Sequence, residues 1–335
     1  MFRPGQKVGF TMMANEAKKI WMDGRLVDAG QAHVHVLSHT FHYGVGVFEG
    51  IRCYETPGGP AIFRLEDHVR RLLLSARLYK MPLPYSAEEV ARAIDETQAA
   101  NEIVPSYIRP IVYRGEPALG VKNLKGKVSL AVAAIPAKKY LGPSSETGVR
   151  AKISPFRKPQ SDAQPSFAKS CGNYVNGYLA GVDAELDGYE EAILLDQNGY
   201  IAEGTGENIF LVRDGTVYTP GLESDILLGI TRSSVITIAE DLGFKVVQKL
   251  LSMNELLSAD ELFFSGTFAE IAPVREVSHY TIGDGKVGPI TREVMQVFYR
   301  TIAGKEPKYA AWLHPVPPLS SFGTSHRGAA PKGTA

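Results

Sequence analysis

Residues 167–174 read Phe-Ala-Lys-Ser-Cys-Gly-Asn-Tyr, a stretch in which one lysine, Lys169, is surrounded by small side chains. Small neighbours leave room beside the lysine amine, and a partly desolvated setting lowers the pKa of the amine, which favours its reactive neutral form. Tyr174 follows five positions later. Because most lysines are solvated surface charges, this stretch alone is weak evidence for a reactive amine.

A second glycine-rich stretch follows 34 residues after Lys169, where residues 203–208 read Glu-Gly-Thr-Gly-Glu-Asn. Taken alone, its glycines indicate only a turn, and Glu203 could be an exposed carboxylate at the end of a strand. A carboxylate held in place can also keep a pyridine nitrogen protonated, and pyridoxal phosphate chemistry needs this group together with a reactive lysine. The order and spacing of the two stretches therefore indicate a pyridoxal phosphate site.

Composition and charge limit the other classes of function. The length of 335 residues suggests two domains, at about 150 residues each. The formal net charge of +0 gives no indication of a nucleic-acid partner or a membrane surface. Cys53 and Cys171 are far apart, so neither a metal site nor a disulfide scaffold is expected. Reduced cysteines, no signal peptide and no apolar run of about 18 residues predict a cytoplasmic protein.

Turn and helix signals alternate along the chain. Hairpins are predicted at four pairs, Asp23-Gly24, Asn198-Gly199, Asp214-Gly215 and Asp284-Gly285. Apolar residues with helical spacing predict helices over residues 65–79, 231–242 and 291–302. Ser86 and Glu89 predict a capping box at the start of another helix. This mixture of hairpins and helices favours an α+β fold.

The same signals predict how the chain divides. Residues 141–148 read Leu-Gly-Pro-Ser-Ser-Glu-Thr-Gly, which is typical of a linker. It would separate a small N-terminal domain, residues 1–140, from a larger cofactor-binding domain, residues 149–312. Residues 313–335 are rich in Pro, Ser, Gly and Ala, so a disordered tail is expected there.

Six ordered blocks between about Lys19 and Tyr299 resemble the branched-chain amino-acid aminotransferases of the type IV pyridoxal phosphate fold. The blocks are residues 38–44, 47–52, 107–110, 202–208, 229–232 and 265–267. The resemblance implies a two-domain α+β fold with a small N-terminal α/β domain and a larger, barrel-like C-terminal domain.

The resemblance also implies roles toward pyridoxal 5'-phosphate. Lys169 would bond to the cofactor and carry the proton, Glu203 would pair with the pyridine nitrogen, and Tyr174 would bind the ring oxygen. Thr231 lies at the start of a predicted helix, where backbone N–H groups attract a phosphate, although a threonine there could be only an N-cap. The other implied cofactor contacts are Arg64, Gly206, Glu207, Asn208, Leu228, Ile230, Gly266 and Thr267.

For the substrate, one pocket must accept both a branched aliphatic side chain and the side chain of glutamate. The resemblance implies that Arg109 binds the distal carboxylate, because a buried carboxylate is costly unless it is paired. The implied pocket residues are Tyr43, Phe48, Gly50, Arg52, Tyr107, Val121, Ala137, Tyr140, Thr267 and Phe268. Ala137 replaces a tryptophan that is common in relatives, and Phe268 replaces a smaller residue, so the substrate range is left open.

The expected activity is transamination between L-leucine, L-isoleucine or L-valine and 2-oxoglutarate. Tyr43 and the loop near Val121 would reach the active site of an adjoining subunit, which implies a homodimer at minimum and leaves a hexamer open. Alternatives with the same fold are a D-amino-acid or (R)-amine transaminase and a 4-amino-4-deoxychorismate lyase. Arg109 and residues 48–52 favour the first activity, while Lys169 and Glu203 argue against a non-catalytic binding protein of this fold.

Overall fold

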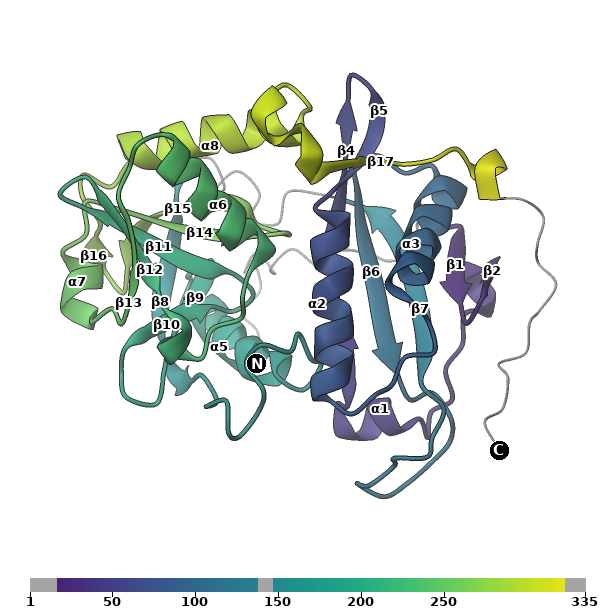
Figure 1. The fold of residues 1–335 in the computed structure, drawn as a ribbon. Coiled ribbons are helices and arrows are strands. Elements are labelled where there is room, and N and C mark those ends of the chain that lie inside the picture. Colours follow the sequence, from purple (N-terminus) through teal and green to yellow (C-terminus); the bar gives the residue numbers. More distant parts are fainter. Residues whose placement is uncertain (1–16, 138–146, 323–335) are drawn as a thin grey trace. The chain divides into compact units, whose positions relative to one another are not determined.

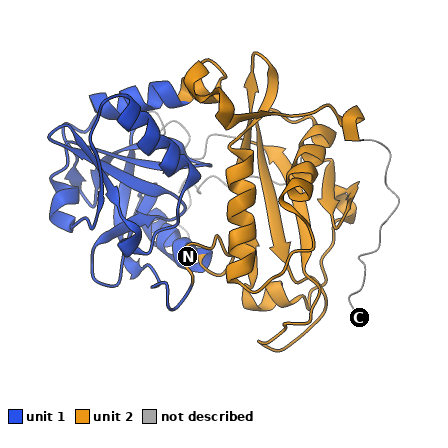
Figure 2. Cartoon of the chain, in the orientation of Figure 1, with its two compact units in different colours: residues 1–13, 138–164, 174–298 blue, residues 14–137, 165–173, 299–335 orange. Residues whose placement is uncertain are grey.

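The computed structural model describes residues 17–137 and 147–322. The chain forms two compact units, shown in Figure 2. Unit 1 contains residues 1–13, 138–164 and 174–298, and unit 2 contains residues 14–137, 165–173 and 299–335. Most of the predicted linker, residues 141–148, lies outside the described residues, so the proposed domain boundaries stay a prediction. The short segment around Lys169 belongs to unit 2, although the sequence on both sides of it belongs to unit 1.

Unit 2 is built on an eight-stranded sheet with the order β17-β5-β4-β6-β7-β1-β2, in which β3 pairs with β6. Its strands are β1 (Lys19–Met22), β2 (Arg25–Asp28), β3 (Gly46–Phe48), β4 (Ile51–Thr56), β5 (Gly59–Phe63), β6 (Ser106–Tyr113), β7 (Ser129–Pro136) and β17 (Leu313–Pro315). The β1–β2 hairpin turns at Asp23 and Gly24, whose φ angles are 45° and 99°. Positive φ at both residues is the reason for the Asp-Gly pair, and the prediction is confirmed.

Two long helices, α2 (Leu65–Leu78) and α3 (Ala87–Asn101), lie side by side over this sheet, as Figure 1 shows. Leu72 and Ile94 from the helices join Ile108 and Leu130 from the sheet in one buried core. The predicted capping box of Ser86 is present at the start of α3. The shorter helices of unit 2 are α1 (His39–Tyr43) and the 3-10 turns η2 (Ala29–Gln31), η4 (Pro307–Trp312) and η5 (Leu319–Phe322).

Unit 1 contains a closed barrel. The strands of unit 1 are β8 (Val149–Arg157), β9 (Glu191–Leu195), β10 (Ile201–Gly204), β11 (Asn208–Arg213), β12 (Thr216–Pro220), β13 (Val246–Lys249), β14 (Glu261–Gly266), β15 (Glu270–Val277) and β16 (Tyr280–Thr281). The order β10-β9-β8-β15-β14-β11 closes on itself because β10 also pairs with β11. Ile193, Leu211 and Phe264 fill the core of the barrel. The barrel-like domain is therefore confirmed.

The helices of unit 1 are α5 (Tyr174–Leu186), α6 (Ile230–Asp241), α7 (Met253–Leu257) and α8 (Pro289–Ile302), of which residues 299–302 belong to unit 2, with the 3-10 turn η3 (Leu222–Ser224). α5 packs on β8 and β9, and α6 packs on β13 and β14. Gly243 follows α6 with a φ of 89°, as predicted for a helix stop. Within residues 17–137 and 147–322, no helix is long and apolar enough to span a bilayer.

One predicted hairpin lies in another place. β15 and β16 pair, but their turn is at Ser278 and His279, whose φ angles are 44° and 71°. The reason is burial: Val277 and Ile282 are both in the core, which leaves only the intervening residues to turn. Asp284-Gly285 instead forms a later turn in which Gly285 donates to the Ile282 carbonyl. The hairpin prediction at this pair was wrong.

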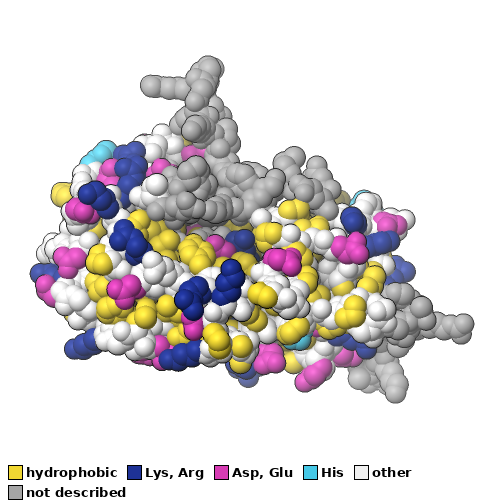
Figure 3. All heavy atoms as spheres, turned by 90° about the horizontal axis from the view of Figure 1, so that it is seen from above, with side chains coloured by type: hydrophobic (Ala, Val, Ile, Leu, Met, Phe, Trp, Pro, Cys, Tyr) yellow, Lys and Arg dark blue, Asp and Glu magenta, His cyan; other side chains and the backbone are white. Residues whose placement is uncertain are grey.

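Residues 313–322 were expected to belong to a disordered tail, but the structure contains a strand and a 3-10 turn there. Leu313–Pro315 pairs with β5, whose outer edge offers free backbone groups, and His314 lies 3.0 Å from the Asp95 carboxylate. Composition alone does not show such pairing. Residues 323–335 lie outside the described part of the chain. On the face shown in Figure 3, basic and acidic side chains of the described residues are interspersed, in line with the net charge of +0.

Candidate active site

Lys169 lies on an extended segment that runs antiparallel to β3 in unit 2. The Phe48 N–H donates to the Lys169 carbonyl at 2.9 Å, and the Cys171 N–H donates to the Gly46 carbonyl at 2.8 Å. A Cβ on Gly46 would lie 3.1 Å from the Cys171 sulfur, so a larger residue would push the segment away. Glycine at position 46 thus allows the lysine segment to pair with β3.

The Lys169 amine lies against an aromatic ring and among charges. Its Nζ is 5.1 Å from the centre of the Phe48 ring. Burial, followed by the positive charge of Arg71, lowers the pKa of Lys169 from 10.5 to about 8, although Glu49 and Tyr107 act in the opposite direction. A larger fraction of the amine is therefore neutral near pH 7 than in an ordinary lysine, which is the form needed for attack or for accepting a proton.

Arg109 and Tyr107 lie beside the same phenylalanine. The Arg109 guanidinium is 4.5 Å from the Phe48 ring centre and donates to the Tyr107 hydroxyl at 3.0 Å. Gly50 makes this possible, because a Cβ at that position would lie 2.0 Å from the Tyr107 hydroxyl oxygen. Unit 2 thus brings together Lys169 and four of the residues predicted to bind substrate.

Arg52 and Tyr43 occupy two different places in unit 2. Arg52 is buried on β4, directly opposite Tyr107 of β6, and its guanidinium lies 5.2 Å from the Tyr54 ring centre. The Tyr43 hydroxyl accepts from the Gly120 N–H at 3.0 Å, next to Val121, whose side chain is exposed. Tyr43 and Val121 therefore lie together at the surface, as expected if both serve a neighbouring subunit.

Two other predicted residues, Arg64 and Ala137, belong to unit 2. Arg64 directly precedes α2, and its guanidinium pairs with Asp67 and stacks 5.1 Å from the centre of the Trp312 ring. Ala137 follows β7 and donates its N–H to the Pro105 carbonyl at 3.0 Å. Tyr140 lies outside the described residues.

Glu203 is a buried carboxylate in unit 1 with three contacts. Its Oε2 accepts from Asn208 Nδ2 at 3.2 Å and from the Leu227 N–H at 2.9 Å, and its Oε1 contacts the Lys158 ammonium. The side chain is only 9% exposed. The alternative of an exposed carboxylate at a strand end is therefore excluded, and the group is held in one position.

The glycine-rich turn after Glu203 gathers several of the predicted cofactor residues. The Gly206 N–H donates to Glu207 Oε2 at 3.0 Å, and a Cβ on Gly206 would lie 3.9 Å from the Tyr174 ring. A Cβ on Gly266 would lie 3.2 Å from Glu207 Cγ. Tyr174, Gly206, Glu207 and Gly266 are thus neighbours in unit 1. Thr267 and Phe268 follow in the half-buried turn between β14 and β15.

The start of α6 is joined to Glu203 through Asn208. Gly229 is the N-cap, and no side chain caps the helix. A Cβ on Gly229 would lie 2.0 Å from Asn208 Oδ1, so glycine is required for this approach. Thr231 lies inside the first turn, so its interpretation as the N-cap was wrong. The first-turn N–H groups of α6, which follow Leu228 and begin at Ile230, carry the positive end of the helix dipole, the feature of a helix that attracts anions.

Two features of the site were missed by sequence reasoning. Lys158, which pairs with Glu203, stands in an Arg-Lys-Pro run that is typical of a solvated surface, so no local signal marks it. Glu49 lies inside one of the quoted blocks, and it is bound by Arg71 of α2. No local signal marks this pair either, because the two residues are 22 positions apart and α2 carries other arginines.

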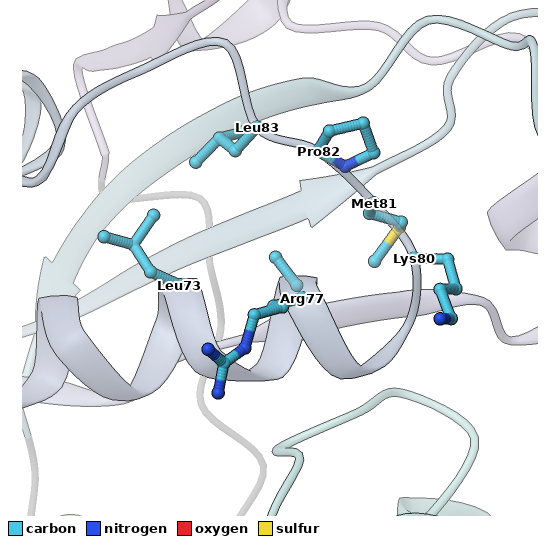
Figure 4. A pocket seen from close by; sticks show the side chains of 7 residues that line it. Leu73, Arg77, Lys80, Met81, Pro82 and Leu83 are labelled. Atoms are coloured by element: carbon cyan, nitrogen blue, oxygen red, sulfur yellow. The ribbon is translucent and has the colours of Figure 1, made fainter.

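A pocket at the C-terminal end of α2 lies elsewhere in unit 2 (Figure 4). It is lined by Leu73, Ala76, Arg77, Lys80, Met81, Pro82 and Leu83. By helical geometry, Leu73 and Arg77 lie on the side of α2 opposite Arg71. None of the predicted site residues lines this pocket, so it has no part in the candidate active site.

Comparison with known proteins identifies the family. The family model described as amino-transferase class IV matches residues 46–277. The branched-chain-amino-acid aminotransferase of Escherichia coli is 41% identical over 307 residues, which is 91% of this chain and 99% of that protein. The resemblance inferred from the six sequence blocks is thus confirmed.

Solved structures agree with this assignment. The branched-chain aminotransferase of Thermoproteus uzoniensis with norvaline is 45% identical, with a TM-score of 0.86 over 89% of this chain and 99% of that chain. The branched-chain amino acid aminotransferase of Thermobaculum terrenum, in its PLP-form, is 34% identical, with a TM-score of 0.84 over 90% and 99% of the two chains. The chain therefore belongs to the class IV aminotransferase family and is a transferase enzyme.

Proposed function

We propose that this chain transfers the amino group of L-leucine, L-isoleucine or L-valine to 2-oxoglutarate in two half-reactions, with pyridoxal 5'-phosphate as the cofactor. The observation that carries the proposal is the Lys169 amine, with its lowered pKa, beside the Phe48 ring that also contacts Arg109. The similarity to branched-chain aminotransferases supports the choice of substrate. Among the described residues of the site, none favours the D-amino-acid, (R)-amine or lyase alternatives.

The side chains of the site fit the chemistry of pyridoxal phosphate. Glu203 would accept the N–H of the protonated pyridine ring, and the uncapped start of α6 would bind the phosphate through Leu228, Ile230 and Thr231. Bound pyridoxal phosphate supplies an electron sink for the negative charge left when the substrate Cα loses its proton. The Thermobaculum terrenum relative, solved in its PLP-form, supports this cofactor.

Other residues would complete the cofactor site. Tyr174 would donate to the ring oxygen, and Gly206, Glu207, Asn208 and Gly266 would form the wall beside it, because they already lie together in unit 1. Arg64 and Thr267 would add donors to the phosphate. The Arg64 guanidinium is engaged with Asp67 and the Trp312 ring, so it would have to share its N–H groups with the phosphate.

Lys169 would bond to the cofactor and then move the proton at the substrate Cα. A general base works best when its pKa lies near the working pH, and the pKa of Lys169 is lowered to about 8. The hydrogen bond from the Phe48 N–H to the Lys169 carbonyl fixes the backbone, so that only the side chain swings. The same amine can therefore accept a proton at one atom and return it at another.

Arg109 gives one pocket two uses. Its guanidinium would pair with the distal carboxylate of glutamate, a group that is costly to bury unpaired. When a branched substrate is present, the guanidinium remains stacked on Phe48 and bonded to Tyr107, which leaves an apolar surface. Gly50, Arg52, Ala137, Tyr140, Thr267 and Phe268 would line the rest of the pocket. Norvaline in the Thermoproteus uzoniensis structure supports an aliphatic substrate.

We also propose that the chain is a homodimer at minimum. Large apolar side chains are exposed in and around α1 and in the loop that contains Val121, namely Val36, Phe41, Leu119, Val121 and Leu124. Such a patch is more easily explained if a second copy covers it, with Tyr43 and Val121 completing the neighbour's pocket. Light scattering should give the mass of a dimer or a multiple of it, such as a hexamer; a monomer would contradict the proposal.

A cytoplasmic location is proposed as well, because Cys53 and Cys171 are free thiols, and free thiols fit a reducing compartment.

A substrate panel tests the function. Purified protein with pyridoxal 5'-phosphate and 2-oxoglutarate should form glutamate from L-leucine, L-isoleucine and L-valine, and from neither D-alanine nor (R)-1-phenylethylamine. Lys169→Ala is the matched negative control. Activity with D-alanine or the amine but not with L-leucine would overturn the choice of substrate. Full activity of Lys169→Ala would overturn the assignment of the lysine.

A further inference from the structure

One face of α2 and the residue that follows the helix carry four polar side chains at spacings of three, four and four. They are His68, Arg71, Ser75 and Tyr79, and we call them the polar stripe. At 3.6 residues per turn these positions point in nearly the same direction. His68 and Ser75 are fully buried. Because buried polar groups are costly unless they are bonded, the partners of the stripe show what it serves.

The first half of the stripe binds the Glu49 carboxylate. Arg71 Nε lies 2.7 Å from Oε1, Arg71 Nη2 lies 2.9 Å from Oε2, and His68 Nδ1 lies 2.7 Å from Oε2. Burial opposes the charged carboxylate, but the charge of Arg71 and the hydrogen bonds from Arg71 and His68 outweigh it, and the pKa of Glu49 lies well below its ordinary value. Burial lowers the pKa of His68, so the pair of full charges is that of Arg71 and Glu49.

The second half of the stripe binds the lysine segment, through one backbone group and one side chain. Ser75 Oγ accepts from the Lys169 N–H at 3.1 Å and donates to the Arg71 carbonyl at 2.8 Å. The Tyr79 hydroxyl donates to Ser170 Oγ at 2.7 Å. Since Phe48 already donates to the Lys169 carbonyl, both backbone groups of the lysine are fixed.

We propose that the polar stripe of α2 positions Lys169: Ser75 holds its backbone N–H, Tyr79 holds the side chain of the adjacent Ser170, and Arg71, fixed by Glu49 one helical turn before Ser75, brings a positive charge to the same segment. This proposal rests on the proposed role of Lys169 as the reactive amine. The groups whose charges act on the amine are Arg71 and Arg109, which disfavour its protonation, and Glu49 and Tyr107, which favour it. Burial has the largest effect on the amine, and among these four charges the largest effect is that of Arg71, a member of the stripe.

The electrostatic half is tested by measuring the pKa of Lys169 in the full-length chain without cofactor. Competitive acylation across a pH series, with the labelled peptide quantified by mass spectrometry, reports the neutral fraction of one chosen lysine. Arg71→Met should raise the pKa of Lys169; a rise of about one would lower its labelling rate at pH 7 about tenfold. Arg71→Lys keeps the positive charge, so the labelling rate should stay close to that of the wild type.

Two further variants make this test decisive. Arg70→Met is the matched control, because Arg70 is the adjacent arginine of α2 and its side chain is 75% exposed; labelling of Lys169 should not change. If Arg71→Met does not fold, Glu49→Gln/Arg71→Met removes both buried charges together, which proteins tolerate better than an unpaired one. The pKa of Lys169 in the double variant is then compared with that in Glu49→Gln, because Glu49 acts on the amine in the opposite direction to Arg71. Equal pKa values in those two variants, or an unchanged pKa in folded Arg71→Met, would overturn the electrostatic role.

The positioning half is tested by hydrogen exchange. Ser75→Ala removes the acceptor of the Lys169 N–H, so peptides that cover residues 167–172 should exchange faster, while peptides from α3 should not change. Unchanged exchange at the lysine segment would overturn this role. Neither measurement needs cofactor or turnover, so failure of this proposal can be told apart from failure of the proposed function, which would appear as a cofactor that does not bond to Lys169.

Discussion

Replacing Glu203 by glutamine should reduce both the stability of unit 1 and the chemistry of the site. The carboxylate accepts from three donors, Lys158, Asn208 and the Leu227 N–H. A glutamine amide offers one oxygen, so its NH₂ group must face a donor in either orientation. Breaking a buried ion pair from one side costs about 3–5 kcal/mol. Because the two side chains are 13% and 9% exposed, we expect the lower end, about 3 kcal/mol.

For Glu203→Gln we expect changes in two measurable quantities, the melting temperature of the protein and the rate of the half-reaction. For a unit of this size, about 3 kcal/mol corresponds to a decrease in melting temperature of about 6–12 °C. At a temperature where the variant is folded, the half-reaction with L-leucine should be slower by about 10²-fold or more, since one strong electrostatic contact to the transition state is lost. That factor equals about 2.7 kcal/mol of activation free energy. Calorimetry and stopped-flow absorbance at saturating cofactor measure the two effects separately.

Glu240→Gln is the matched control, because Glu240 is exposed on α6; both quantities should stay at their wild-type values. If Glu203→Gln binds cofactor and keeps the half-reaction rate within about threefold of wild type, Glu203 is structural only. A lower melting temperature with an unchanged rate would refute the catalytic reasoning while leaving the observed hydrogen bonds intact.

Three other predictions follow from the site. Arg109→Leu should slow the half-reaction with L-glutamate far more than that with L-leucine, because it removes the partner of the distal carboxylate but keeps an apolar pocket; equal losses would show that Arg109 does not distinguish the substrates. Ala137→Trp should lower kcat/KM for L-phenylalanine relative to L-leucine by about 1–3 kcal/mol of discrimination, and an unchanged ratio would place Ala137 outside the pocket. Because the pKa of Lys169 is about 8 in the folded chain and 10.5 in an ordinary lysine, the unfolded chain binds more protons between these values, and the free energy of unfolding should rise with pH across this window. Lys169→Met without cofactor should therefore be more stable than wild type below pH 8, by at most about 3 kcal/mol, and urea unfolding should show the difference shrinking towards pH 10; a constant difference would contradict the lowered pKa.

Local signals in the sequence predicted much of the fold because they act over a few residues. Asp23-Gly24 and Asp214-Gly215 turn where positive φ angles require them, and Ser86 begins α3 through its own hydrogen bonds. The pair at Asp284-Gly285 failed because burial of Val277 and Ile282 decided where β15 ends. Tertiary packing thus overrides turn chemistry when the two disagree.

The candidate site was less predictable from its residues alone. Motif positions pointed to Lys169 and Glu203, but the partners that control their charge come from distant parts of the chain. Lys158 is 45 residues from Glu203, and Arg71 is 22 residues from Glu49. Such pairs are formed by the packing of strands and helices, and no spacing rule within the sequence indicates them. The pairing of β17 with β5 was missed for the same reason.

The central claim, that Lys169 is the lysine that bonds to pyridoxal 5'-phosphate, can be tested by chemical trapping. Borohydride reduction of the cofactor-loaded protein makes the bond permanent, and peptide mass spectrometry then locates it. We predict a phosphopyridoxyl group on Lys169 in the wild type, and none on any lysine of Lys169→Ala loaded in the same way. A group found on another lysine, or retained at full level in Lys169→Ala, would contradict the account.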